Sequence, residues 1–549
     1  MISSPPPNKP TRNHIMKSVM RHQFSQVPKA EIQRSSFDRS HGLKTTLDAG
    51  YLVPVFVDEA LPGDTFSLRM TTFARFSTPL HPIMDNCYCD AFFFAVPYRL
   101  VWNNFVKFFG EQDNPGDSTS YLVPTSTSPV GGYLNGSLQD YMGLPTQVAG
   151  ITHSCLHLRA YNRIWNEWFR DQNLQPSVTV NKGDGPDPVT DTVLLRRGKR
   201  HDYFTSALPF PQKGPAVSIP LGTAATVRTN ATNLVTGVAS PMLVQQSGGG
   251  GAAPNNVAFA AGNTGTGTFS TSSTATIAGY LGAYPSNLYA DLTTATAATI
   301  NQLRQAFQIQ RIYERDARGG TRYTELIQSH FGVTSPDARL QRSEYLGGGS
   351  TPINFNPVAQ TGPTGTTGSS TPLGNLGAIG TMSHSGVGFS KSFTEHCLLI
   401  GMVSIRADLN YQQGLNRMWS RSTRFDFYWP ALSHIGEQAV LNQEIMAQGI
   451  AADTTAWGYQ ERFAEYRYKP SIVTGQFRSN YATTLDSWHL AQNFATLPTL
   501  NATFIVDNPP ISRVVAVPTQ PTMLLDAYFN LNCARPMPVY GVPGMIDHF

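Results

Sequence analysis

The chain has 549 residues, of which 40% are hydrophobic and only 14% are charged, and its formal net charge is +4. This length and apolar content allow a sizeable core and roughly three or four domains of about 150 residues. The 47 glycines and 39 prolines favour turns and strands over long solvated helices. Because lone soluble proteins usually carry a denser mixture of surface charges, this composition favours a chain that associates with copies of itself.

Local features argue against three classes of protein. Residues 1–46 are polar and basic and lack the apolar stretch of a signal peptide. The most apolar stretches, 91–102 and 397–405, are shorter than the about 20 residues that cross a bilayer. The five cysteines are too few and too scattered for a disulfide framework, so we expect reduced core residues at Cys87, Cys89, Cys155, Cys397 and Cys533. We therefore expect neither secretion, nor a membrane span, nor a disulfide scaffold.

The N-terminal segment concentrates positive charge. Between residues 1 and 46, eight Lys or Arg residues stand against Glu31 and Asp38, a net charge of +6, so the remaining chain carries −2. We predict that residues 1–46 form a basic arm that lies inside an assembly and faces nucleic acid. Its candidate contact residues are Lys9, Arg12, Lys17 and Arg21.

Strands are predicted next along the chain. In Phe66, Leu68 and Met70 apolar side chains alternate with polar neighbours, which is the period-two pattern of a half-buried strand. Residues 52–57 and 87–96 are also strand candidates, the second of them fully buried. Residues 151–173 follow a helical period instead, and we predict an amphipathic helix there. One face of it carries Leu158, Tyr161, Ile164, Trp165, Trp168 and Phe169.

The middle of the chain contains two long segments that resemble loops. Residues 223–299 hold only Arg228 and Asp291 as charges, and residues 346–390 hold none. Both are rich in Gly, Ser and Thr, so we expect surface loops that build no core of their own. Helices are predicted between them, at 300–315 and 323–331.

The last part of the chain again favours strands. Alternation is clearest at 424–429 and 523–533, and further candidates lie at 397–406, 504–507 and 513–517. Strands at both ends of the chain indicate one β-sandwich domain over 47–549, assembled from distant segments, with loop and helical insertions. That is the organisation of a double-sheet jelly roll.

The sequence contains no motif that predicts a catalytic residue, a metal site or a cofactor site. Thiolate and imidazole ligands suit zinc, but in the predicted helix Cys155 would point about 200° away from His153, which separates it from a site with Cys87, Cys89 and His157. Residues 386–392 lack the spacing of a phosphate-binding loop, and neither GxSxG nor HExxH occurs. Asp316, Glu325 and Asp337 lie among arginines and are expected to form ion pairs.

Two basic clusters contain aromatic residues. Arg196, Arg197, Lys199 and Arg200 precede Tyr203 and Phe204, and aromatic platforms with cations hold single-stranded nucleic acid without reading its sequence. Arg and Tyr are also enriched at subunit interfaces, so for this cluster the two readings stand equal. The interface reading is favoured for the second cluster, which comprises Arg462, Tyr466, Arg467, Tyr468 and Lys469.

Several blocks of the sequence resemble the major capsid proteins of gokushovirus-type Microviridae, which are small single-stranded DNA phages. The resemblance spans about 47–541 and is carried by LDAGYLVPVFVDEALPGDTF (47–66), STPLHPIMDN (77–86), RAYNRIWNEWFRDQN (159–173), RGKRHDYFTSALPFPQKGPAV (197–217), ERDARGGTRYTELIQSHFGVTSPDARLQRSEYLGG (314–348), KSFTEHCLLIG (391–401), RMWSRSTRFDFYWPALSHIGEQ (417–438) and AEYRYKPS (464–471). It implies an eight-stranded antiparallel jelly roll that builds a T=1 icosahedral shell around a circular single-stranded DNA genome, without enzymatic activity.

The resemblance also implies where this chain acts and with what. It implies a virion protein assembled in the bacterial host cytoplasm, with three kinds of partner besides itself and the genome: a small basic DNA-binding virion protein, other minor virion proteins and a host surface receptor. Residues 223–299 correspond to the insertion loop around the threefold axes. There Val257, Phe259, Phe269, Ile277, Tyr280 and Tyr284 are predicted to pack with symmetry mates.

One alternative belongs to a different class. Jelly rolls also serve as lectins, so a carbohydrate- or surface-binding β-sandwich module is the second hypothesis. A basic arm has no purpose in a lectin but suits the inside of a genome container, so the first hypothesis is preferred.

Overall fold

The computed structural model describes residues 32–214, 300–320, 322–334, 341–362 and 374–540, together with six short strands between 226 and 291. The chain divides into two compact units. The larger unit contains Met1–Pro211 and Thr334–Phe549, and the smaller contains Gln212–Val333. In the described part of the chain, no helix is long and apolar enough to cross a membrane.

The larger unit contains a six-stranded antiparallel sheet. Its strand order is β1-β22-β4-β16-β15, and β2 also pairs with β22. In β4 every second side chain is buried, as period-two alternation predicts. The strands are β1 (Ser35–Asp38), β2 (His41–Leu47), β4 (Thr65–Phe76), β15 (Asn354–Ala359), β16 (Leu376–Ser392) and β22 (Met523–Arg535).

A four-stranded antiparallel sheet accompanies it, in the order β14-β5-β17-β3. All residues of β17 are buried, because alternate side chains enter two different hydrophobic clusters. Leu399 and Val403 belong to the cluster shared with the six-stranded sheet, whereas Leu398 and Ile400 belong to the cluster that includes α3. The strands are β3 (Val53–Ala60), β5 (Cys87–Pro97), β14 (Glu344–Pro352) and β17 (Cys397–Ala407).

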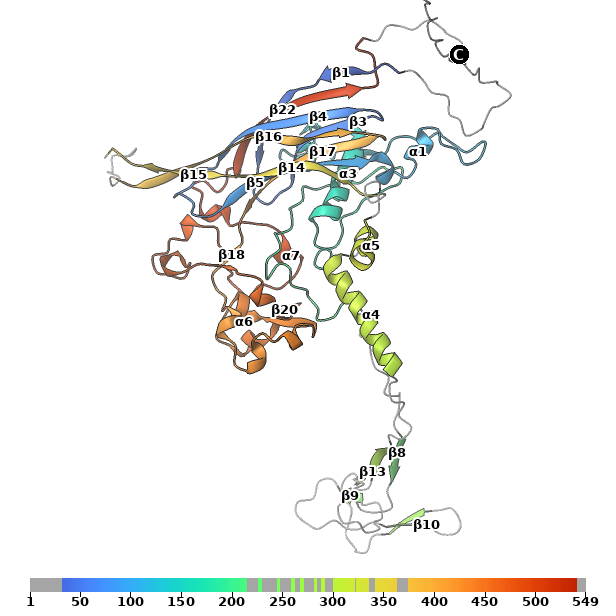
Figure 1. The fold of residues 1–549 in the computed structure, drawn as a ribbon, viewed down its shortest axis with the longest axis vertical. Helices are drawn as coiled ribbons and strands as arrows, with labels where there is room; N and C mark the ends of the chain where they lie inside the picture. Colours follow the sequence, from blue (N-terminus) through green and yellow to red (C-terminus); the bar gives the residue numbers. More distant parts are fainter. Residues whose placement is uncertain are drawn as a thin grey trace, which may run out of the picture. The chain divides into compact units, whose positions relative to one another are not determined.

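The two sheets pack face to face around one core (Figure 1). Phe56 of β3 lies 5.5 Å from Phe529 of β22, and Phe93 of β5 lies 5.7 Å from Phe389 of β16, as ring-centroid distances. The predicted mainly β architecture with antiparallel sheets is therefore confirmed. So are the strands predicted at 52–57, 66–71, 87–96, 397–406 and 523–533.

Helical segments cover the other face of the four-stranded sheet. The helix predicted at 151–173 is shorter than expected: β7 (Thr152–Ser154) precedes α3 (Leu156–Ile164), which continues as the π-helical turn η3 (Trp165–Phe169). Short elements accompany it, namely η2 (Tyr98–Leu100), α1 (Phe105–Phe108), β6 (Thr125–Thr127), α2 (Leu138–Tyr141) and η4 (Val189–Asp191).

A third cluster forms around Tyr203, Phe204, Val440, Ile445 and Trp457. Most of its buried residues lie in a segment of short strands and helical turns between residues 410 and 513. These are β18 (Asn410–Tyr411), η6 (Arg417–Trp419), η7 (Arg424–Asp426), η8 (Pro430–Leu432), β19 (Glu437–Leu441), α6 (Asn442–Ile445), η9 (Ala451–Thr454), β20 (Ala456–Glu461), η10 (Ala464–Tyr466), β21 (Ser471–Ile472), η11 (Gly475–Phe477), η12 (Asp486–Trp488), α7 (Ala502–Ile505) and η13 (Ile511–Arg513).

The smaller unit contains both predicted helices, α4 (Ile300–Gly319) and α5 (Tyr323–Phe331). His330 Nε2 lies 2.6 Å from Asp316 Oδ1 and ties the two helices together. The unit also contains three antiparallel strand pairs, which are β8 (Thr226–Thr229) with β13 (Leu288–Asp291), β9 (Val244–Gln246) with β12 (Leu281–Ala283), and β10 (Ala258–Ala261) with β11 (Gly267–Ser270).

The prediction of a loop at 346–390 is wrong, because β14, β15 and β16 occupy most of this segment. Several of its glycines allow close packing of strands. A Cβ added at Gly347 would lie 2.5 Å from the carbonyl oxygen of Gly388, and one at Gly348 would lie 2.2 Å from that of Ala91. Only glycine fits such an approach of two backbones.

Three predicted strands near the C-terminus are also wrong. Residues 424–426 form the 3-10 turn η7 and residues 427–429 form no strand, because the Asp426 carboxylate accepts the Ser422 and Thr423 N–H groups, which competes with strand pairing. Residues 504–507 begin within α7, whose first turn is capped by Asn501. Residues 513–517 follow the 3-10 turn η13 and contribute one isolated bridge, between Val515 and Pro79.

The predicted arm ends earlier than expected. Residues 35–38 and 41–47 form β1 and β2, which pair with β22 and so belong to the six-stranded sheet. The four candidate contact residues of the arm lie outside the described residues.

Candidate functional site

An aromatic hollow of about 420 Å³ lies beside β5, β14 and η3. Five aromatic side chains line it, from three elements that are distant in sequence: Phe92, Phe94, Trp168, Phe169 and Tyr345. The polar lining comes from Arg170, Asp171, Arg197, Lys199, Arg200 and His201. We refer to this site as the aromatic hollow.

Alternation along β5 explains why aromatic rings gather there. Phe93 points into the core between the sheets, so Phe92 and Phe94 point to the opposite face, where η3 packs. The ring of Phe94 lies 5.5 Å from those of both Trp168 and Tyr345. Trp168 and Tyr345 remain 41% and 43% exposed, so part of each side chain is accessible to a ligand.

Trp168 is held in place by polar contacts. Its indole N–H donates to Ser343 Oγ at 2.9 Å, and Ser343 Oγ in turn lies 2.6 Å from a Glu167 carboxylate oxygen. The guanidinium of Arg342 stacks 4.0 Å from the ring centroid of Trp168. The hollow therefore presents a fixed aromatic platform with a cation beside it.

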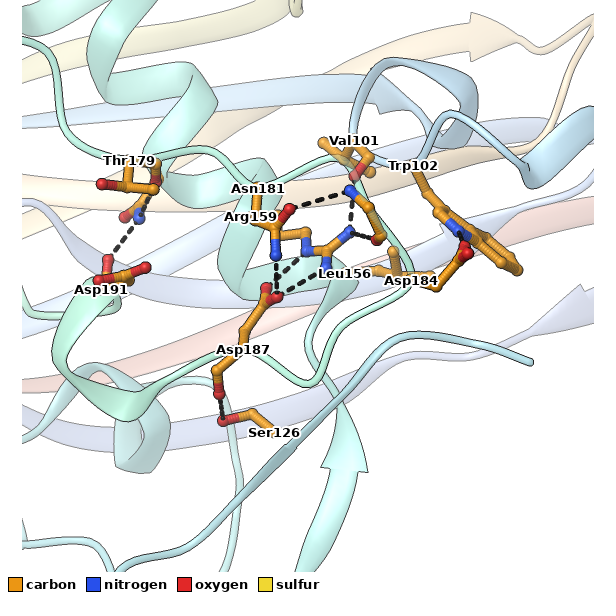
Figure 2. A network of polar contacts seen from close by, with 12 residues as sticks. Val101, Trp102, Ser126, Leu156, Arg159, Thr179, Asn181, Asp184, Asp187 and Asp191 are labelled. Atoms are coloured by element: carbon orange, nitrogen blue, oxygen red, sulfur yellow. Dashed lines mark hydrogen bonds and ion pairs between the residues drawn. The ribbon is translucent and has the colours of Figure 1, made fainter. Parts of the chain in front are cut away.

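Helix α3, which leads into η3, is anchored by a buried ion pair (Figure 2). Arg159 contacts both Asp187 carboxylate oxygens, at 2.6 and 2.7 Å, and its remaining terminal nitrogen donates to the carbonyl oxygens of Val101 and Gly183. Asn181 donates to the same carboxylate at 2.7 Å. This network fixes the helix that positions Trp168 and Phe169.

The predicted basic run is largely engaged within the chain. Arg197 and Arg406 both contact the Asp90 carboxylate, at 2.7 and 2.8 Å. Lys199 is buried, with its Nζ 4.3 Å from the ring centroid of Phe504. Arg196 stacks over Tyr51 and donates to the carbonyl oxygen of Ala49. Of the four predicted residues only Arg200 is exposed, so the structure narrows the prediction of DNA contact to that side chain.

Burial and charge set the protonation of this cluster. Burial raises the pKa of Asp507 to about 6, although Arg197 and Lys199 oppose the shift. Burial also lowers the pKa of Lys199, and the Asp507 and Asp202 carboxylates partly offset that effect. These cations therefore serve mainly to balance the buried carboxylates.

The insertion-loop residues are only partly described. Phe259 of β10 pairs directly with Phe269 of β11. Val257, Ile277, Tyr280 and Tyr284 lie outside the described residues. Packing at a threefold axis stays a prediction.

The predicted interface cluster lies at η10. Tyr466, Arg467, Tyr468 and Lys469 are exposed. Arg467 forms an ion pair with Glu461, and Arg462 donates to the carbonyl oxygen of Phe425 at 2.6 Å. A contact with another subunit at this cluster also stays a prediction.

The thiols and histidines considered for zinc have other surroundings. All five cysteines are buried and unpaired, and burial raises the pKa of Cys87, Cys89 and Cys155 to about 12. His153 Nε2 bonds the Tyr133 hydroxyl at 2.7 Å. Among the described residues, no three His, Cys, Asp or Glu side chains are grouped so as to hold a metal ion.

Sequence reasoning missed the aromatic hollow. The local sequence pattern places Trp168 and Phe169 only on a helical face, and Phe92 and Phe94 only in a buried strand. Tyr345 lies against Phe94 because β14 and β5 pair at these two residues. That pairing cannot be predicted from the local sequence pattern. The surplus of aromatic residues at the end of the predicted helix was the one available signal.

Comparisons with known proteins agree with the fold. A family model described as capsid protein (F protein) matches residues 25–545. Capsid protein VP1 of Bdellovibrio phage phiMH2K is 50% identical over 96% of this chain and 98% of its own length. The VP1 proteins of Chlamydia phage 1 and Spiroplasma virus 4 are 47% and 37% identical, over 96% and 95% of this chain and 98% and 97% of their own lengths. The chain therefore belongs to the capsid protein (F protein) family and is a structural major capsid protein of the gokushovirus-type Microviridae, not an enzyme.

Proposed function

We propose that copies of this chain close into a T=1 icosahedral shell around a circular single-stranded DNA genome, with eight of the ten strands in the two main sheets acting as an antiparallel jelly roll. The observation that carries this proposal is the pair of antiparallel sheets around one core, in a chain that matches virion capsid proteins over nearly its whole length. Assembly takes place in the bacterial host cytoplasm. The shell also contacts a small basic DNA-binding virion protein and other minor virion proteins.

The aromatic hollow supports the DNA part of this proposal. Bases stack on aromatic faces regardless of sequence, and nearby cations contact phosphates. Trp168 and Tyr345 offer such faces, and the exposed Arg200 lies on the lining of the same hollow. Lys9, Arg12, Lys17 and Arg21 add positive charge on the inner side of the shell.

Replacing Trp168 with Leu is expected to weaken binding of an oligo-dT strand to the purified subunit by roughly tenfold, because one base loses its stacking partner. Arg200→Gln is expected to reduce the slope of log affinity against log salt by about one. Both effects are measured by fluorescence anisotropy over a range of salt concentrations. Tyr528→Leu is the matched control, since Tyr528 is 53% exposed on β22, outside the hollow. If the parent and the three variants all bind the oligo-dT strand with equal affinity, the aromatic hollow is excluded as a DNA site.

We also propose that residues 223–299 project at the threefold axes and contact a host receptor. The three short strand pairs in this segment are compatible with an elaborated loop, and the segment belongs to the smaller compact unit. Binding functions concentrate in loops held by a rigid scaffold.

Replacement of residues 230–286 by a short Gly-Ser linker is expected to leave particles that assemble but no longer adsorb to host cells. The segment is rich in Gly, Ser and Thr and belongs to the smaller compact unit, so we expect the core of the larger unit to fold, and shells to assemble, without it. Particle yield is measured by sedimentation and adsorption by loss of particles from the medium. The same linker at 363–373 serves as the control and should adsorb normally. Truncated particles that adsorb like the parent would contradict the proposal.

A further inference from the structure

One surface of the larger unit exposes an unusual number of aromatic side chains. Trp419 is 73% exposed, and Phe425, Phe427, Tyr428 and Trp429 are each about half exposed. Residues 462–469 continue this surface, because the ring of Tyr428 lies 5.2 Å from that of Phe463 and 6.3 Å from that of Tyr466. We call residues 417–435 and 462–469 the aromatic surface. Exposed apolar patches of this kind mark interaction sites.

Polar contacts hold the aromatic surface in one conformation. The Trp429 indole N–H donates to the carbonyl oxygen of Arg424 at 2.8 Å, and Arg462 donates to that of Phe425 at 2.6 Å. The Asp426 carboxylate accepts the Thr423 N–H at 2.7 Å. The rings are therefore organised before any partner arrives, which reduces the entropy lost on binding.

The charges on this surface favour a protein partner over nucleic acid. Arg421 pairs with Glu465, and Arg467 pairs with Glu461, so these two cations are already neutralised and are less free to contact a polyanion. Arg424, Arg462 and Lys469 form no ion pair among the described residues, which leaves a small positive excess. Trp, Tyr, Phe and Arg are the residues enriched at the centres of protein interfaces.

A second copy of this chain offers the complementary surface. At the end of α1, Phe108 and Phe109 are 37% and 57% exposed. Glu111 and Asp113 follow directly, are exposed, and form no ion pair among the described residues. Phe105 of α1 packs on the cluster around α3, whereas the aromatic surface adjoins the cluster around Tyr203, and α1 and β20 lie well apart (Figure 1). A single copy therefore leaves both surfaces uncovered.

We propose that the aromatic surface of one subunit docks against the surface around α1 of a neighbouring subunit, with Arg424 and its basic neighbours facing Glu111 and Asp113. This inference rests on the proposed function, that the chain closes into a shell. A contact between two different patches of identical subunits is heterologous, and such contacts generate closed rings where the rotation between subunits closes, as a shell requires.

The aromatic half of the contact is tested with Trp419→Ser/Phe425→Ser. Because both side chains are exposed, the unassembled subunit should keep its thermal unfolding midpoint, whereas the yield of shells should fall roughly tenfold or more. The control is Leu524→Ser/Tyr528→Ser, which removes two side chains of similar exposure, 52% and 53%, from β22. Shell yields are compared by sucrose-gradient sedimentation.

The charge pairing is tested by exchange. Arg424→Glu alone and Asp113→Arg alone should each lower the yield of shells, and the two changes in one chain should restore it, since positions 424 and 113 again carry opposite charges. If the two single variants lose shell yield and the double variant does not recover it, the proposed charge pairing is wrong.

The remaining outcomes are also decisive. Variants that assemble like the parent overturn the inference. Variants that assemble normally but lose bound DNA or another virion protein overturn it too, and assign the surface to that partner. If the unmodified chain forms no shells, the proposed function fails instead, so the two failures are distinguished.

Discussion

Gly388→Ala is expected to lower the free energy of unfolding of the subunit by about 3 kcal/mol, which is the upper part of the range for overpacking. Gly388 lies in β16, and a Cβ there would come within 1.9 Å of the carbonyl oxygen of Leu68 in β4. A backbone atom cannot swing away as a side chain does, so the two central strands of the six-stranded sheet would have to separate. Urea unfolding of the unassembled subunit measures the difference.

Gly377→Ala in the same strand is the matched control. A Cβ at Gly377 would have only one neighbour within 4 Å, the carbonyl oxygen of Val358 at 3.8 Å, which is ordinary contact. Its effect is expected to stay within about 0.5 kcal/mol, as for substitutions away from packed sites. Equal losses at the two positions would show that the close approach of β16 and β4 is not what requires glycine.

Arg159→Met is expected to lower the free energy of unfolding of the subunit by about 3–5 kcal/mol, because it leaves the buried Asp187 carboxylate without its cation. The two side chains are only 2% and 4% exposed, so water does not replace the lost contact. Two carbonyl oxygens, of Val101 and Gly183, lose a donor at the same time. Lys44→Met is the control, since its pair with Asp526 is 84% and 56% exposed and should contribute less than about 1 kcal/mol.

The pH dependence distinguishes this ion pair from simple packing. Burial tends to raise the pKa of Asp187, but the hydrogen bonds and charge of Arg159 lower it below the ordinary value of 3.8. A carboxyl group with a lowered pKa stabilises the folded state above that ordinary value and loses its contribution as the pH falls through the folded pKa. The difference in free energy of unfolding between the parent and Arg159→Met should therefore become smaller below pH 3.8. A deficit that is constant with pH would assign the loss to packing alone.

The strands of the two main sheets could be predicted where burial alternates or is continuous, as in Phe66–Met70 and at 523–533, because these patterns depend on local sequence alone. The segment at 346–390 could not, since glycine that permits a close approach of backbones has the same composition as glycine in a flexible loop. The distinction lies in the partner strand, and pairing partners are not visible in one sequence.

The aromatic residues at 424–429 show a second limit. Alternation of Phe425, Phe427 and Trp429 predicted a strand with one buried face, yet the structure exposes all three. Bonds from Asp426 to its own preceding backbone select a turn, and the apolar side chains remain uncovered in the single subunit. In the docking that we propose, these side chains are withdrawn from water on assembly, so the pattern of an interface imitates the pattern of a core.

The central claim is that this chain builds a closed shell. The most direct test is to purify the full chain, sediment it and image the resulting fractions by electron microscopy. Our account predicts spherical particles of one size with icosahedral symmetry, together with smaller rings of subunits. A stable monomer that persists at high protein concentration, with no particles in any fraction, would contradict it.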